Sequence, residues 1–143
     1  MDPESLIANV LCWSRNDQRV VALGLLGSYA RGDQAPDSDI DICVLTPRPR
    51  SLLEDPSWIY RLGSGARIAE PVEDYNLVQS IRVFYGETEV ELGVTDQAWA
   101  EAPMDAGTAG VINDGLRTLY DPDGLLESAR GLAAAFKTSG GGD

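Results

Sequence analysis

The stretch Gly27-Ser28-Tyr29-Ala30-Arg31-Gly32-Asp33-Gln34-Ala35-Pro36-Asp37-Ser38-Asp39-Ile40-Asp41-Ile42 joins two features that suit a phosphorylated ligand. The first is a small-residue turn, Gly27-Ser28, which ends an apolar run and lets the backbone approach a phosphate closely. The second is a pair of acids, Asp39 and Asp41, at the start of another apolar run. Acids two residues apart in a strand share one face and suit a divalent cation. Together the two features predict a site for a metal–nucleotide complex.

Apolar runs on both sides of this stretch predict two strands. Residues 20–26 form a continuous run rich in branched side chains, which is typical of a strand buried on both faces. From position 39 to position 44, branched residues alternate with Asp39, Asp41 and Cys43. This period of two places both acids on one face of the second strand and the branched residues on the other.

The remaining residues predict a single domain that contains both helices and strands, the α/β (α+β) class. In residues 88–95, Val90, Leu92 and Val94 share one face of a strand, and Glu89 and Glu91 share the other. We expect the domain to span residues 1–137, with a core of about 1–120, a C-terminal helix of about 121–137 and a flexible tail at 138–143. The other expected elements are a helix at 3–17 capped by Asp2, a short helix at 29–31, a polar loop at 32–38, short helical pieces at 51–54 and 58–62, an irregular segment at 63–74, hairpin strands at 77–85 and 88–95 around Gly86-Glu87, a short helix at 96–101 and a broken helix at 106–119.

Composition excludes several classes of function. The net charge of −12 weighs against bulk nucleic acid as a partner, since such surfaces need clustered cations. The chain has no histidine, so Ser-His-Asp and Cys-His catalysis are excluded, and zinc lacks its usual ligands. We expect Cys12 and Cys43, which form no CxxC pattern, to be buried reduced thiols.

The sequence predicts a cytoplasmic protein without membrane contact. No apolar run approaches about 20 residues, the length that a membrane span needs. The N-terminal segment has no basic region followed by an uninterrupted apolar core, so we expect no signal peptide.

A third carboxylate from a neighbouring strand would complete an acidic cluster. Two metal ions in a phosphoryl-transfer site lie about 3.5–4 Å apart, so carboxylates on one sheet face can share them. We prefer Glu91 because Val90 and Leu92 hold it in mid-strand, whereas Glu89 is solvated or serves as a general base. Taken singly, these motifs have a plainer interpretation: Asp-rich segments are usually turns, and Gly27-Ser28 is a strand-to-helix turn. Their coupling favours the functional interpretation.

The residues of 27–32 and 38–42, with Val90-Glu91-Leu92 as a weaker match, resemble the signature of the DNA polymerase beta-like nucleotidyltransferase superfamily. The sequence looks closest to the minimal nucleotidyltransferases and to the core of the antibiotic (aminoglycoside) nucleotidyltransferases. The resemblance implies a mixed β-sheet flanked by helices. It also implies that Gly27 and Ser28 hold a triphosphate and that Asp39, Asp41 and Glu91 hold two Mg²⁺ ions. It also implies transfer of a nucleoside monophosphate from an NTP, with ATP as the first expectation, to an acceptor hydroxyl.

Other polar and aromatic residues near the motif have two interpretations each. Arg31 either contacts the phosphates or forms a structural ion pair with Asp33 or Asp37. We expect Tyr29, Tyr85 and Trp58 to pack in the core rather than to stack on the nucleobase.

The sequence is compatible with three alternative functions. The leading hypothesis is a nucleotidyltransferase acting on a small molecule or a protein. Antibiotic-modifying relatives have an additional helical domain that helps to form the acceptor site, so here we expect a small site or one completed by a second subunit of a homodimer or a helical partner protein. The second is an antitoxin that adenylylates a partner toxin. The third is a nucleotide-binding or partner-binding module without catalysis.

Overall fold

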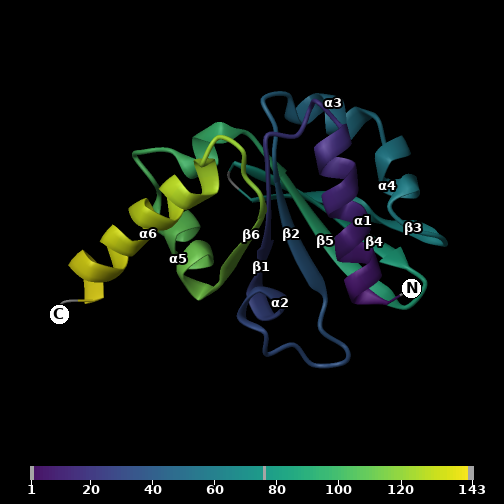
Figure 1. The fold of residues 1–143 in the computed structure, drawn as a ribbon, viewed down its shortest axis with the longest axis horizontal. Coiled ribbons are helices and arrows are strands. Elements are labelled where there is room, and N and C mark those ends of the chain that lie inside the picture. Colours follow the sequence, from purple (N-terminus) through teal and green to yellow (C-terminus); the bar gives the residue numbers. More distant parts are fainter. Residues whose placement is uncertain (1, 76, 142–143) are drawn as a thin grey trace.

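The computed structural model describes residues 2–75 and 77–141 as six strands and seven helical segments (Figure 1). The strands are β1 Ala22–Leu26, β2 Ile40–Leu45, β3 Ala66–Tyr75, β4 Val78–Tyr85, β5 Thr88–Thr95 and β6 Leu116–Tyr120. The helices are α1 Pro3–Asn16, α2 Gly27–Arg31, α3 Pro49–Glu54, α4 Ser57–Arg61, the 3₁₀ turn η1 Gln97–Ala100, α5 Ala106–Asp114 and α6 Leu125–Gly141. Within the described residues, no helix is both long and apolar enough to cross a membrane.

The strands form one mixed sheet in the order β3-β4-β5-β2-β1-β6. The β2–β5 pair is parallel, and every other neighbouring pair in that order is antiparallel. This arrangement confirms the predicted mixed sheet. The strand that holds the acids, β2, lies between β1 and β5, so both of its edges are hydrogen-bonded.

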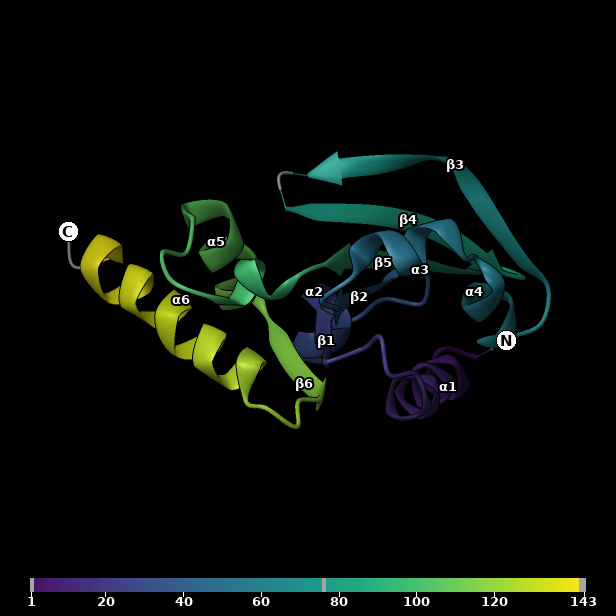
Figure 2. The same ribbon diagram turned by 90° about the horizontal axis from the view of Figure 1, so that it is seen from above.

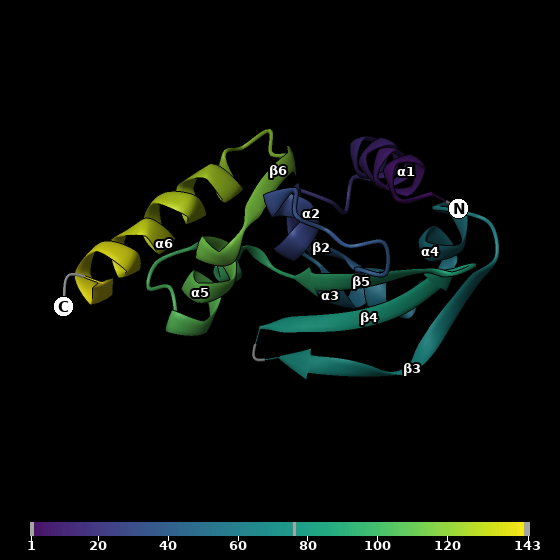
Figure 3. The same ribbon diagram turned by 90° about the horizontal axis from the view of Figure 1, so that it is seen from below.

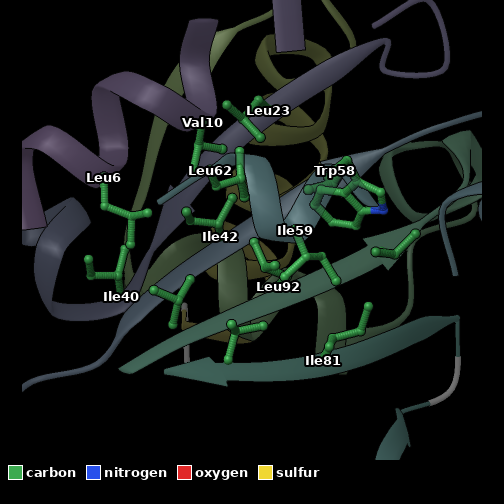
Figure 4. Close-up of a cluster of buried hydrophobic side chains, with 14 of the residues drawn as sticks. Leu6, Val10, Leu23, Ile40, Ile42, Trp58, Ile59, Leu62, Ile81 and Leu92 are labelled. Atoms are coloured by element: carbon green, nitrogen blue, oxygen red, sulfur yellow. The ribbon is translucent and has the colours of Figure 1, made fainter. Parts of the chain in front are cut away.

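The alternation of side chains in the central strands divides the interior into two cores, one on each face of the sheet. Ile40 and Ile42 pack on the first face together with residues of α1 and α4, as Figure 4 shows. Cys43 and Leu45 point to the second face, where they pack with residues of η1, α5 and α6. Figures 2 and 3 show α1 on one side of the sheet and the α5–α6 pair near its β6 edge. The sheet is therefore covered by helices on both faces, as expected.

Two aromatic residues that had a possible role with a nucleobase belong to the first core. Trp58 is fully buried and its ring stacks on that of Trp13, with centroids 4.4 Å apart. Tyr85 is also fully buried, and its hydroxyl donates a hydrogen bond of 2.7 Å to the carbonyl of Ile59. Tyr29 is half-buried against the same core. The preference for packing over base stacking agrees with these contacts.

Local capping explains where several predicted elements begin. The Asp2 carboxylate accepts a 2.9 Å hydrogen bond from the Ser5 N–H, and Pro3 opens α1 without losing a needed donor. Asp96 caps η1 in the same way. The β4–β5 hairpin turns at Gly86, whose φ of 67° favours glycine. The predicted 3–17 helix, the hairpin and the short 96–101 helix are confirmed.

The irregular segment expected at 63–74 was wrong, because residues 66–75 form the edge strand β3. Its register with β4 shifts between Ala69 and Glu73, a stretch that contains Pro71. Proline cannot donate to a sheet ladder, so it is tolerated at an edge strand or a bulge. The glycines and the proline of this segment indicated a loop, whereas pairing with β4 makes it a strand.

The broken helix expected at 106–119 was also wrong in its second half. Helix α5 ends at Asp114, and residues 116–120 form β6, which pairs with the outer edge of β1. Gly115 makes the transition with a φ of 158°, and a Cβ there would lie 2.9 Å from Cγ of Arg31. Residues 116–120 form a strand because the outer edge of β1 is available for pairing. The local sequence pattern gives no sign of that edge.

The last helix starts and ends later than predicted. It begins at Leu125, and the Asp121 carboxylate accepts hydrogen bonds of 3.1 Å from the N–H groups of Leu126 and Glu127. It continues to Gly141, so residues 138–141 of the expected tail are helical, since adding a turn costs less than starting one. Residues 142 and 143 lie outside the described part of the chain.

Cys12 was expected to be buried but is exposed, because it faces away from the side of α1 that packs on the sheet. Cys43 is buried, as expected.

The Tyr85 hydroxyl provides a test of the first core. Tyr85→Phe removes the hydrogen bond to the buried carbonyl of Ile59, and we expect a loss of about 1–2 kcal/mol in the free energy of unfolding. Urea denaturation followed by circular dichroism measures it. Tyr60→Phe is the matched control, because Tyr60 is 53% exposed and its variant should unfold like the wild type. Equal stabilities of the two variants would contradict the assignment of Tyr85 to the core.

Candidate functional site

Asp41 lies at the point where three strands meet. In the antiparallel pair of β1 and β2 it is opposite Leu26, the last residue of β1. In the parallel pair of β2 and β5 it is opposite Glu91. Paired residues of neighbouring strands point to the same face of a sheet, so Asp41 and Glu91 project together. Both line one cavity on the second face, which has a volume of about 160 Å³.

The Gly27-Ser28 turn follows Leu26 directly and is therefore held beside Asp41. Gly27 has a φ of 66°, a conformation that favours glycine, and an added Cβ would meet no atom within 4 Å. The backbone conformation, and not a lack of space, thus requires glycine here. Helix α2 starts at this residue, and no side chain caps its first turn. The structure thus places the turn next to Asp41, at the end of β1 that pairs with the start of β2.

Negative charge accumulates around Asp41. Burial raises the pKa of its carboxyl to about 7, and repulsion by Glu91 and then by Asp39 contributes to the same rise. Asp39 precedes β2 and is half-buried, as is Glu91. Asp41 therefore interacts with both of the other predicted site acids. Close carboxylates of this kind are stable together only when protonated or when a cation offsets their charge.

The donor set suits a hard divalent cation, since all three side chains offer carboxylate oxygens. In residues 2–75 and 77–141, however, no group of three or more His, Cys, Asp or Glu side chains is close enough to hold a metal as it stands. Cation binding would have to draw Asp39 or Glu91 closer to Asp41. The three carboxylates are suitable ligands for such a cation. Their side chains are not yet close enough together to bind it.

Glu89, the candidate general base, is engaged elsewhere. Its Oε2 lies 3.2 Å from Nε of Arg82 in a partly exposed ion pair. Arg82 is also the β4 residue opposite Glu91 in the sheet register. The sequence analysis did not identify Arg82, although its place in the alternation of β4 puts it on the same face as Glu91.

Arg31 forms the structural ion pair that was one of its two interpretations. Its Nε lies 3.1 Å from Asp33, and its second contact, at 2.8 Å, joins Nη1 to the carboxylate of Asp114 at the end of α5. These hydrogen bonds and charges raise the pKa of the guanidinium above its usual range. The pairing to Asp33 was anticipated, whereas Asp114 is 83 positions away in the sequence and had no signal. Arg31 ties the end of α2 to the end of α5.

The cavity beside the acids was missed by sequence reasoning. Ser80, Gly93, Trp99 and Val111 contribute to its lining, and they come from β4, β5, η1 and α5. The only local signal is Gly93, because a glycine inside a strand often marks a close approach or an open space. A Cβ at this position would lie 3.1 Å from Cγ1 of Val78.

The charge at Asp41 predicts an unusual dependence of stability on pH. Folding raises the pKa of this carboxyl from 3.8 to about 7, so the folded state favours its protonated form. The free energy of unfolding therefore falls as the pH rises through this range. At pH 8 the cost is at most about 4 kcal/mol. We therefore expect Asp41→Asn to raise the midpoint of thermal unfolding at pH 8 in EDTA and to change it little at pH 4. An equal effect at both pH values would contradict the raised pKa.

Two solved structures match this chain. The crystal structure of an aminoglycoside 6-adenyltransferase from Bacillus subtilis matches with a TM-score of 0.52 and 17% identity, over 70% of this chain and 37% of that chain. A crystal structure of a toxin–antitoxin with AMP-PNP matches with a TM-score of 0.46 and 15% identity, over 97% of this chain and 89% of that chain. The chain thus spans little more than a third of the aminoglycoside enzyme, with which it shares a fold. No curated protein sequence matches it.

The family described as "Nucleotidyltransferase domain" matches residues 7–100, which is more than half of the chain. The matched region contains the Gly27-Ser28 turn together with Asp39, Asp41 and Glu91. It covers β1, α2, β2 and β5, the elements that meet at the site. The protein belongs to the nucleotidyltransferase domain family.

Proposed function

We propose that the protein transfers a nucleoside monophosphate from an NTP, with ATP as the expected donor, to the hydroxyl of an acceptor. The observation that supports this proposal best is the position of Asp41 in the sheet. It pairs with Leu26 of β1 on one side and with Glu91 of β5 on the other. This register puts the small-residue turn on one side of the acid and a second carboxylate on the other. A phosphate-binding turn beside paired carboxylates is the arrangement that phosphoryl transfer uses.

Each group has a distinct part in the proposed reaction. The backbone at Gly27 and the Ser28 hydroxyl bind the triphosphate, and the open space around Gly27 admits it. Asp39, Asp41 and Glu91 would hold the divalent cations, for which Mg²⁺ is the first expectation. When bound, these ions neutralise charge on the reacting phosphates and lower the pKa of the acceptor hydroxyl.

The acceptor hydroxyl attacks the α-phosphorus, and pyrophosphate leaves. Because Glu89 is paired with Arg82, we assign no side-chain base, and in this proposal the hydroxyl proton passes to solvent. Acids alone do not prove turnover, and the alternative is a nucleotide-binding module without catalysis. Incubation with each α-labelled NTP and an extract separates the two, because the module would bind nucleotide and yield no labelled product.

Titration calorimetry with MgATP tests the carboxylates. We expect Asp41→Asn and Glu91→Gln each to raise the Kd at least tenfold, since each loses a ligand of the cation that accompanies the triphosphate. Glu87→Gln is the matched control: Glu87 lies in the exposed turn of the same hairpin and should bind as the wild type does. Wild-type affinity in both site variants would exclude the proposed metal–nucleotide site.

A second titration separates the two roles of Arg31. If Arg31 contacts phosphate, Arg31→Gln should weaken MgATP binding about tenfold, the effect of losing one charge-assisted contact. Asp114→Asn should then bind nearly as tightly as the wild type, because it removes only the anchor at the end of α5. Equal losses in the two variants would instead show that Arg31 acts by holding α2 in place.

A further inference from the structure

The cavity beside Asp41 and Glu91 has apolar walls away from the acids. Leu26, Val78, Trp99 and Val111 line it, and they come from β1, β4, η1 and α5. The carboxylates of Asp41 and Glu91 therefore border a space whose remaining lining is mostly hydrocarbon, a lining unsuited to phosphates. It extends from Leu26, the residue of β1 that precedes the Gly27-Ser28 turn, across β2 to β5 and β4.

The size of the cavity suits one aromatic ring. Its volume is about 160 Å³. An apolar protein cavity of roughly 150 Å³ accepts benzene. Gly93 keeps the floor open, because a Cβ at this position would lie 3.1 Å from Cγ1 of Val78. The ring of Trp99, which is nearly buried, offers an aromatic wall.

A second, larger cavity adjoins the first and gives it a route to the surface. It has a volume of about 440 Å³ and shares Val78, Trp99 and Val111 with the smaller cavity. Leu77 and Val111 line it and are each 44% exposed. An apolar substituent on the ring would continue into this space. The route from solvent to the acids is thus bordered mostly by apolar side chains, with Asp105 and Thr108 as the polar residues of the larger cavity.

We propose that the smaller cavity is the acceptor subsite and that it takes a small molecule with one benzene-sized ring bearing a hydroxyl. This inference rests on the proposed function. The hydroxyl oxygen bonds to the α-phosphorus of the NTP, the bond from that phosphorus to the bridging oxygen breaks, pyrophosphate leaves, and the proton goes to solvent. A sugar ring fits poorly, because its hydroxyls would face Val78, Trp99 and Val111 without partners.

Titration calorimetry with 4-propylphenol tests the subsite without relying on turnover. We expect saturable binding to the wild type, with glucose at the same concentration giving no heat of binding. Val111→Asp should weaken the binding at least tenfold, since it places a charge on the wall between the two cavities. Tyr60→Asp makes the same kind of change at an exposed residue of α4 and should bind as the wild type does.

Two further titrations separate this inference from the proposed function. Asp39→Asn should still bind 4-propylphenol, even where it no longer binds MgATP, because Asp39 does not line the cavity. Saturating MgATP should leave a site for the phenol on the wild type, because donor and acceptor bind together. Loss of phenol binding on addition of MgATP would assign the cavity to the nucleobase and overturn the inference. Absence of binding to the wild type, or equal binding by Val111→Asp, would overturn it as well.

Discussion

The register of β2 between β1 and β5 is the constraint on which the rest of the structure depends. The strand alternates between Ile40 and Ile42 on one face and Asp41 and Cys43 on the other. A slip of one residue would place the Asp41 carboxylate in the first core and the isoleucines in the cavity. Burial of Ile40 and Ile42 beneath α1 and α4 therefore determines where the acid points. The hydrophobic core and the site are specified by the same strand.

This arrangement puts stability and the proposed activity in opposition. Burial of Asp41 and its repulsion by Glu91 and Asp39 raise its pKa to about 7, so its ionised form destabilises the folded chain. A core without this carboxylate would be more stable. Groups that conflict with local packing rules often mark functional sites. A bound cation would convert the same repulsion into attraction, so we expect ligand and fold to stabilise each other.

The two sides of β2 also suggest a division between donor and acceptor. The glycine–serine turn follows Leu26 of β1, and the apolar cavity extends from Leu26 past Asp41 to β5 and β4. Arg31 connects the turn to the end of α5 through Asp114, while Val111 of the same helix lines the cavity. Helix α5 thus contacts both halves of the site. Its position depends on Gly115, which lets the chain pass close to Arg31 and enter β6.

Sequence by itself determined the elements whose signals are local. The alternation around Asp41, the hairpin at Gly86 and the capping by Asp2 and Asp96 were all predicted, because side-chain period and backbone preference act within a few residues. Glu91, the residue opposite Asp41 in β5, could be named for the same reason, as an acid in mid-strand of a predicted strand. Only the tertiary structure decided which strands pair. Strands β3 and β6 form because β4 and β1 offer free edges, so their glycines and Pro71 misled local reasoning. The cavity and the Arg31–Asp114 contact likewise join distant segments, and such contacts arise from packing that no local pattern encodes.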